Sequence, residues 1–252
     1  MNSLGQWHLF SLICLLLPFI GNSRQIITQM SSSNRNKKLT TNFFDFVGPS
    51  DLAFVFGDQT GKITATLEKM AVKTVSIQPF SNYFGVLSRQ FTPESGVVLV
   101  HEDVGAFHAE FYHNGIYEKH ILPYSSNLTA DETQEYVIIT TLDELIERYG
   151  LPAFCHISGD GFEPDLMKGL NNPIKTVAFT FYSYSSEKTT EILRRLLHIG
   201  DYEFNWKKSA DGKFLSKNWL SARDLHQSMS SYGKSVFSGE IYARVKQHYD
   251  SI

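Results

Sequence analysis

Short apolar runs alternate with amphipathic segments along most of this chain, and this alternation constrains the fold more than any other feature. In the first half, residues 52–56, 73–77 and 97–100 have the length and composition of buried strands, with helical patterns over 61–71 and 81–90 between them. The second half continues the pattern with strands at 152–158, 174–182, 202–206 and 239–246 and helices at 141–150, 163–170 and 185–200. Such alternation predicts an α/β fold: a Rossmann-like, doubly wound, mostly parallel sheet with helices on both faces and an antiparallel strand near 238–246.

Two local signals sharpen this prediction. Thr141 is a suitable N-cap for the helix that follows it, and Gly150 is a suitable residue to end that helix. Asn114-Gly115 is the dipeptide that two-residue hairpin turns favour, so it predicts a β-hairpin insertion in which Glu110 faces Lys119.

The first 23 residues differ from the rest. They contain no Lys, Arg, Asp or Glu, and residues 9–20 are apolar except for Ser11 and Pro18. This run is shorter than a membrane-spanning helix and is followed by small residues, which favours a secretory signal peptide cut near Ser23. Basic residues follow the run, however, so an uncleaved anchor with a cytoplasmic domain stays open, as does a buried N-terminal helix. Residues 24–42 are polar and predict a linker before a domain at 43–252.

Bulk composition excludes some partners. The formal net charge is −3 and the sequence pI is about 6.3, which gives no basic field for binding nucleic acid. Membrane association would therefore rest on residues 1–23. Asn127 begins a glycosylation sequon that is usable only on the secretory route.

Metal and thiol chemistry have weak support. His101, Glu102 and Asp103 are adjacent and further histidines lie near 108–120, but their spacing matches no zinc or calcium loop, so no metal is predicted. Cys155 lies in an apolar run, which favours a buried structural thiol over a nucleophile.

The stretch "FVFGDQTGKIT" at 54–64 joins the first predicted strand to a helix through two glycines. A phosphate loop would need four residues between its glycines and Ser or Thr after the lysine, whereas Gly57 and Gly61 enclose three residues and Ile63 follows Lys62. The remaining reading is a doubly wound fold whose first turn brings bare backbone close to a nucleoside cofactor.

The second half carries a more specific pattern. The segment "TLDELIERYGLPAFCHISGDGFEPDLMKGLNNPIKTVAFTFYS", then "LHIGDYEFNW" and "SGEIYARV", resembles the C-terminal half of the FkbM-type methyltransferase family in order and spacing. With the first half the resemblance covers about residues 40–245. It implies a class I methyltransferase-like domain that uses S-adenosylmethionine to methylate a small molecule or sugar, most simply at an oxygen.

The resemblance also implies where the cofactor would lie. The family's first turn, which reads like "DIGANVG", aligns with residues 55–61 and matches at Gly57 and Gly61. The family's carboxylate before the first glycine is Val55 here, and Asp58 is the carboxylate that would serve in its place. At the end of the second strand, Gln78 takes the position of the family's ribose-binding acid.

The family's turn "KIDVEG" aligns with residues 156–161, so its lysine is His156, its first acid is Ser158 and its second acid is Asp160. Asp160 is either a catalytic base or a turn residue that caps the next helix, and His156 is either a base or a structural histidine. These changes leave two functions open: a methyltransferase with degenerate cofactor motifs, or a catalytically inactive relative that acts as a secreted or membrane-associated binding module.

Overall fold

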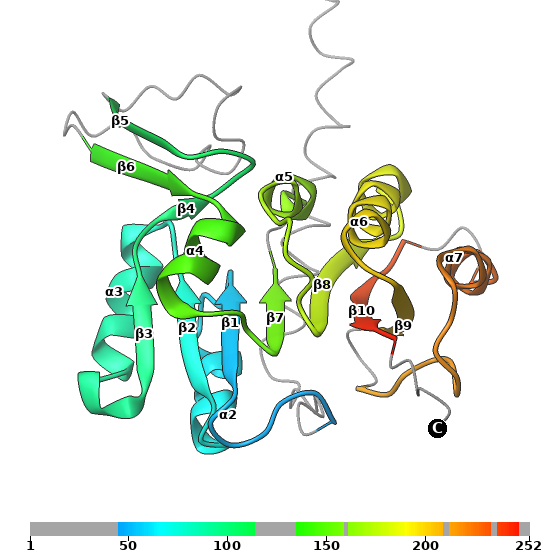
Figure 1. The fold of residues 1–252 in the computed structure, drawn as a ribbon, viewed down its shortest axis with the longest axis horizontal. Coiled ribbons are helices and arrows are strands. Elements are labelled where there is room, and N and C mark those ends of the chain that lie inside the picture. The colour runs from blue at the N-terminus through cyan, green and yellow to red at the C-terminus, as the bar shows by residue number, and fades with distance from the viewer. Residues whose placement is uncertain (1–44, 114–134, 159–160, 209–211, 233–235, 247–252) are drawn as a thin grey trace, which may run out of the picture. The chain divides into compact units, whose positions relative to one another are not determined.

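The computed structural model describes residues 45–113, 135–158, 161–208, 212–232 and 236–246 (Figure 1). All of them belong to one unit of the chain, residues 41–252. The strands are β1 (Leu52–Phe56), β2 (Lys73–Ile77), β3 (Val97–Val100), β4 (Asp103–Val104), β5 (Ala109–His113), β6 (Glu135–Thr140), β7 (Phe154–Ile157), β8 (Thr176–Tyr182), β9 (Tyr202–Lys208) and β10 (Ser238–Val245). The helices are α2 (Lys62–Lys69), α3 (Ser81–Gln90), the 3-10 turn η2 (Pro93–Ser95), α4 (Leu142–Tyr149), α5 (Glu163–Lys168), α6 (Ser186–Ile199) and α7 (Ala222–Ser230).

The main sheet has seven strands in the order β3-β2-β1-β7-β8-β10-β9. Strands β3, β2, β1, β7 and β8 are parallel to one another, whereas β10 is antiparallel to both β8 and β9. The strand order reverses at β1. Strands β2 and β3 lie on one side of β1, and β7, which follows α4 in the chain, pairs with its other side. The predicted doubly wound, mostly parallel sheet with an antiparallel strand near 238–246 is confirmed, and this arrangement is that of a Rossmann-like class I methyltransferase fold.

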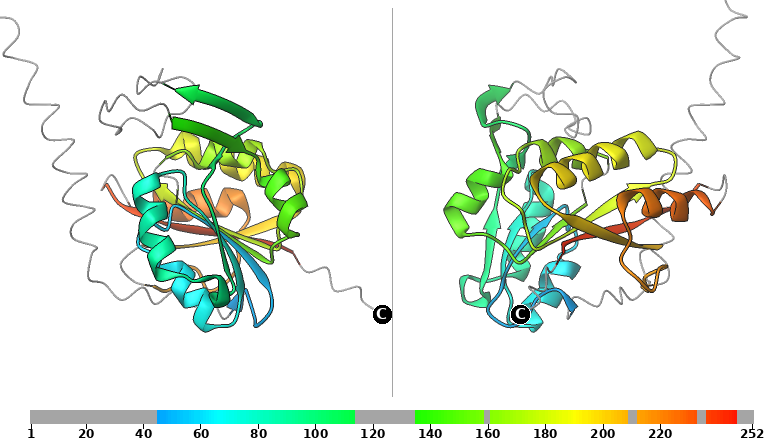
Figure 2. Two further views of the ribbon diagram at one scale, coloured as in Figure 1. Left: turned by 90° about the vertical axis from the view of Figure 1, so that its left-hand side faces the viewer. Right: turned by 45° about the vertical axis from the view of Figure 1, so that its right-hand side comes forward.

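Helices cover both faces, as the alternation predicted. Strand residues such as Cys155 and Ile157 pack in a core with Leu142, Leu166 and Leu196 of α4, α5 and α6, and we call this side the α4 face. On the other side, the α2 face, Leu67 of α2 packs with residues of β1, β7 and β10. Figure 2 shows α5 and α6 on one side of the sheet and α2 and α3 on the other.

Local signals explain several helix boundaries. The Thr141 side chain accepts a hydrogen bond from the Glu144 N–H at 3.1 Å, and the Glu144 carboxylate accepts one from the Thr141 N–H at 3.0 Å. This is a complete capping box, and the helix ends at Gly150 with a φ of 99°. The predicted cap and stop of α4 are both confirmed.

A smaller sheet, in the order β4-β6-β5, follows β3. The sequence predicted β5 as the first arm of a hairpin, but β6 and α7 were not predicted. Strand β5 pairs with β6, and Glu110 lies opposite Ile138. The Asn114-Gly115 turn and Lys119 lie outside the described residues, so the predicted pairing of Glu110 with Lys119 stays a prediction.

The leader at 1–23, the linker at 24–42 and the sequon at Asn127 also lie outside the described residues. Within the part of the chain that the structure describes, no helix is long and apolar enough to cross a membrane.

Candidate functional site

Strands β2, β1 and β7 end at the same edge of the sheet. Their last paired residues are Ile77, Phe56 and Ile157, which lie side by side in register. Gln78, Gly57 and Ser158 follow directly and therefore continue as a row across this edge. Because open α/β sheets bind ligands outside the carboxyl ends of their strands where the strand order reverses, this edge is the candidate site.

The glycine turn after β1 is held tightly by its own surroundings. Gly57 has a φ of 72°, and a Cβ added there would lie 1.8 Å from the Ser158 carbonyl oxygen. Gly61 has a φ of 69°, and its added Cβ would lie 2.7 Å from Gln90 Oε1 and 2.8 Å from Leu87 Cδ2 of α3. Both predicted cofactor-binding glycines therefore serve the fold by permitting close approach and left-handed backbone. They also leave bare backbone at the edge.

The Asp58 carboxylate binds the first turn of α2. Its oxygens accept hydrogen bonds from the Lys62 N–H at 3.0 Å, the Thr64 N–H at 2.8 Å and the Thr64 hydroxyl at 2.9 Å. These bonds satisfy the free N–H groups at the start of the helix. The predicted replacement for the missing family carboxylate is thus engaged inside the protein.

The apolar side chain of Val55 lies among apolar neighbours, whereas the buried side chain of Gln78 has a polar atom without a partner among the described residues. Val55 is fully buried on the α2 face among Ala53, Leu67 and Phe154. Gln78 is only 1% exposed, and its Nε2 has no hydrogen-bond partner among the described residues. An unsatisfied buried amide is costly, which marks Gln78 Nε2 as a donor that lacks a partner within the described part of the chain.

His156 is the second such side chain. It is 2% exposed, and its Nε2 lies 3.1 Å from Glu240 Oε1 of β10. Its Nδ1 has no hydrogen-bond partner among the described residues. In register His156 lies beside Val55 of β1 and two residue pairs behind the Gly57–Ser158 row.

Glu240 connects His156 to two further polar groups. The Tyr242 hydroxyl donates to Glu240 Oε2 at 3.0 Å, and Lys207 Nζ donates to the Tyr242 hydroxyl at 3.4 Å. Burial opposes ionisation of Glu240, but the hydrogen bond and charge of His156, with help from Tyr242 and Lys207, hold its pKa below its usual value. Burial also lowers the pKa of Lys207 and raises that of Tyr242. We call Gln78, His156, Glu240, Tyr242 and Lys207 the α2-face cluster.

The remaining predicted site residues follow β7 in the sequence. The Thr180 hydroxyl of β8 donates to the Ser158 hydroxyl at 3.3 Å. Asp160 lies outside the described residues, so its catalytic assignment stays a prediction. The structure thus brings Gly57, Gln78, His156 and Ser158 to one edge, with Asp58 behind it at the start of α2.

Glu240 is the functional candidate that the sequence did not reveal. It is 84 positions from His156. The polar Glu240 between apolar residues of a predicted strand was a signal that its side chain faces the other side of the sheet from Ile241, but not that β10 lies beside β8.

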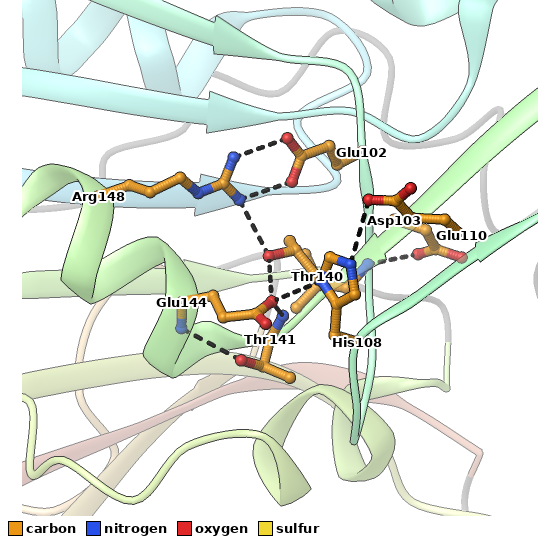
Figure 3. Close-up of polar contacts among 9 residues, drawn as sticks. Glu102, Asp103, His108, Glu110, Thr140, Thr141, Glu144 and Arg148 are labelled. Carbon is orange, nitrogen blue, oxygen red and sulfur yellow. Dashed lines mark hydrogen bonds and ion pairs between the residues drawn. The ribbon is translucent and has the colours of Figure 1, made fainter.

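A second polar group, drawn in Figure 3, joins the small sheet to α4. Arg148 binds Glu102 through two hydrogen bonds of 2.7 and 2.6 Å and also donates to the Thr140 hydroxyl at 2.9 Å. Thr140 donates in turn to Glu144 Oε2 at 2.8 Å, and His108 Nδ1 lies 3.1 Å from the same oxygen. We call these five residues the α4 cluster.

Several pKa values in and beside the α4 cluster are shifted. Burial opposes ionisation of Glu144, but bonds from Thr140, Thr141 and His108 hold its pKa below the usual value. The Glu144 hydrogen bond raises the pKa of His108. Burial raises the pKa of neighbouring Asp103 to about 6, against a smaller opposite effect of the Val104 N–H.

Neither metal nor thiol chemistry gains support. No group of three or more His, Cys, Asp or Glu suited to a metal ion occurs among the described residues. His101 stacks on Phe84, with ring centroids 4.6 Å apart, while Glu102 pairs with Arg148. Cys155 is fully buried, and burial raises the pKa of its thiol, which disfavours the reactive thiolate.

Comparisons with known proteins reach only the level of fold. No family model matches the chain, and no curated protein matches it. Similar solved structures include a TehB-like SAM-dependent methyltransferase from Corynebacterium glutamicum, with 10% identity, a TM-score of 0.41, and coverage of 91% of this chain and 99% of that one. An rRNA methylase from Streptococcus thermophilus has 9% identity, a TM-score of 0.41, and coverage of 81% and 91%.

A third similar structure is the C-terminal domain of precorrin-6Y C5,15-methyltransferase from Rhodobacter capsulatus, with 10% identity, a TM-score of 0.41, and coverage of 84% and 92%. Similarities of this size leave the strand order as the basis of the fold assignment. The resemblance to the FkbM-type family stays a prediction.

Proposed function

We propose that this protein is an S-adenosylmethionine-dependent methyltransferase of the FkbM type that transfers a methyl group to an oxygen of a sugar or other small molecule. The observation that carries the proposal is a pair of buried, unpaired polar side-chain atoms near one edge of the sheet. Two buried polar atoms, Gln78 Nε2 and His156 Nδ1, lack partners among the described residues where a doubly wound sheet binds its ligand. A bound ligand that satisfied both would remove a cost of roughly 1–3 kcal/mol for each.

The residues at this edge fit an S-adenosyl compound in a specific way. The Gly57–Gly61 turn would hold it through backbone, and the Gln78 amide would meet the ribose hydroxyls, which both donate and accept hydrogen bonds. An amide gives up the charge assistance of a carboxylate, worth roughly 1.5–3 kcal/mol, so we expect binding to be about tenfold to a hundredfold weaker than with an acid at position 78.

When bound, S-adenosylmethionine supplies the electrophilic methyl group. The chain must then orient the acceptor hydroxyl and take its proton. Asp160, in the turn after β7, remains our proposed base for this step. His156 is buried within β7, two residues before Ser158, which favours a role in holding the ligand over direct proton transfer.

A second function, a catalytically inactive binding module, is favoured by one set of observations. Val55 is apolar and fully buried, Asp58 is engaged with α2, and position 158 is Ser. None of these supplies the free carboxylate that a cationic cofactor would favour. On this alternative the edge would hold another small molecule, or none.

Calorimetric titration with S-adenosylmethionine and S-adenosylhomocysteine separates the two functions. We expect saturable binding by the native protein and binding about tenfold or more tighter by Gln78→Glu, because a carboxylate accepts the ribose hydrogen bonds with charge assistance. Gln227→Glu makes the same chemical change at an exposed position of α7 and should leave the affinity unchanged. If neither the native protein nor Gln78→Glu binds, in samples shown to be folded, the binding module replaces the enzyme.

We also propose that residues 1–23 direct the chain into the secretory pathway. Sequencing the mature N-terminus tests this directly, with cleavage near Ser23 as the expected result. An intact Met1 in a membrane fraction, with Asn127 unmodified, would instead support the anchor with a cytoplasmic domain.

A further inference from the structure

We propose that His108 is a pH-dependent clasp between the small sheet and α4: as an imidazolium it donates to Glu144 and Glu110 at once, and on deprotonation it releases one of them. This inference goes beyond the proposed function and does not depend on it, because the clasp consists of contacts within the protein. It concerns how firmly the small sheet is held beside the candidate site.

Both ring nitrogens of His108 face carboxylates. Nδ1 lies 3.1 Å from Glu144 Oε2 at the start of α4, and Nε2 lies 3.3 Å from Glu110 Oε1 of β5 (Figure 3). An ionised carboxylate only accepts hydrogen bonds, and a neutral imidazole carries a single N–H, so the neutral ring donates to one of the two at a time. The imidazolium carries two N–H groups. The observed arrangement is therefore that of the protonated side chain.

The charges around His108 favour its protonated form. The hydrogen bond to Glu144 raises the pKa of His108, partial burial opposes the rise, and Glu110 adds to it. Asp103 of β4 is a further acid of this group in Figure 3, and burial raises its pKa to about 6, so it contributes negative charge above that pH. Arg148, the cation of the α4 cluster, is engaged by its own carboxylate partner through two hydrogen bonds.

The clasp matters because β5 has few other anchors. Strand β4 begins two residues after β3, and β6 leads into α4 after one residue, so the chain itself ties both to the rest of the domain. Within the described part of the chain, β5 pairs with β6 alone, and a pair of strands is marginally stable by itself. A modest contact from His108, whose side chain is 48% exposed, is then enough to change how often β5 opens.

The clasp acts at the end of the main sheet that carries the candidate site. Because β4 follows the carboxyl end of β3, the small sheet stands at the end where β1, β2 and β7 also finish (Figure 1). The pKa of His108 is raised, so the stabilisation is complete below the ordinary histidine pKa and is lost as the pH rises through the raised value. Acid strong enough to protonate Glu144, whose pKa is lowered, also opens the clasp.

Hydrogen exchange of the amides of Ala109–His113 tests the clasp in the native protein. After correction for intrinsic exchange rates, we expect these amides to be about three- to tenfold better protected at about pH 6 than at about pH 8.5, since two exposed ion pairs are lost. NMR titration of the His108 ring in the same sample should give the same midpoint, above the ordinary histidine pKa.

Matched variants separate the clasp from other effects of pH. His108→Gln has no second proton to gain, so it should lose the pH dependence of protection, and Glu110→Gln should lower the midpoint of His108. His226→Gln makes the same change at an exposed position of α7 and should keep the native behaviour.

Three results would each overturn the proposal: an ordinary or lowered midpoint for His108, protection of β5 that does not change with pH, or a pH dependence that survives in His108→Gln. If that variant does not fold, the two measurements on the native protein decide.

Discussion

The α4 cluster and the α2-face cluster are both built from charged and hydroxyl side chains, yet they are satisfied to very different degrees. In the α4 cluster, Arg148, Thr140, Glu144 and His108 form a chain of hydrogen bonds that ends on Glu102. In the α2-face cluster, Gln78 and His156 are almost fully buried and each leaves one polar atom without a partner among the described residues. Polar groups that serve only the fold find partners within it, so these unpaired atoms mark the place where we propose that a ligand binds.

The largest expected effect concerns the turn beside the α2-face cluster. Gly57→Ala would place a Cβ 1.8 Å from the Ser158 carbonyl at a φ of 72°, so the β1 and β7 ends must separate. We expect the free energy of unfolding to fall by about 3–4 kcal/mol, measured by chemical denaturation. Gly85→Ala in α3 is the control: a Cβ there meets nothing within 4 Å, and the helix should gain about 0.5–1 kcal/mol. If both substitutions changed the free energy of unfolding equally, the close contact of Gly57 with the Ser158 carbonyl would be contradicted.

The next effect is a pH dependence beside the α4 cluster. Burial raises the pKa of Asp103 from 3.8 to about 6, so the folded chain binds more protons than the unfolded chain between these values. Stability should therefore fall as the pH rises from about 4 to about 6, by about 1–3 kcal/mol from this group, and then level off with respect to it. Asp103→Asn should remove that part of the slope. An unchanged slope in this variant would show that Asp103 ionises normally.

Gln78→Met tests the unpaired amide directly. The substitution keeps the length of the side chain and removes the unsatisfied polar group, so the ligand-free protein should become more stable by about 1 kcal/mol. The same change should weaken S-adenosylhomocysteine binding about tenfold, since the ribose loses a hydrogen-bonding partner. Thermal unfolding and calorimetry measure the two effects. A loss of stability in the free protein would mean that Gln78 Nε2 already has a hydrogen-bond partner. The two clusters would then differ less in how fully their polar groups are hydrogen-bonded.

Thr141→Ala makes the opposite test beside the α4 cluster. Here the hydroxyl caps α4 by accepting from the Glu144 N–H at 3.1 Å, so its removal should destabilise the protein by about 1 kcal/mol. Ligand affinity should stay the same because the Thr141 hydroxyl is engaged by the Glu144 N–H within its own helix cap. Thr141→Ser, which keeps the hydroxyl, should retain most of the stability. An affinity change in the alanine variant without any stability change would link this region to ligand binding.

The sequence predicted the elements well where its patterns were strong. The strands at 52–56, 73–77 and 97–100 occur at these bounds, and α4 begins after Thr141 as its capping pattern indicated. Helix α7 was missed because it is mostly polar, with only Ala222, Leu225 and Met229 apolar. Its cap was visible all the same: Ser221 accepts from the Asp224 N–H at 3.2 Å. Strand β6 was missed because its short apolar run, EYVIIT, is not specific enough to distinguish a strand from other apolar segments.

The candidate site was less predictable than the fold. Spacing and resemblance brought Gly57, Gln78 and His156 to one edge, but a sequence pattern does not report whether a carboxylate is free. Asp58 was read as a ligand contact, whereas its oxygens are bound by the first turn of α2. Glu240 was not considered, because its contact with His156 depends on β10 entering between β8 and β9. Neither fact is encoded within a few residues of the side chain concerned.

The insertion of β10 between β8 and β9 also sets the order in which the protein can be completed during synthesis. Among the described strands, β9 joins the sheet through β10, which is made after it. Until Ser238–Val245 leaves the ribosome, β8 ends the growing sheet with an open edge and β9 has no strand to pair with. The same late segment delivers Glu240 to His156. A nascent chain therefore completes this sheet and gains the Glu240–His156 contact in the same step, and a chain truncated before residue 238 would have neither.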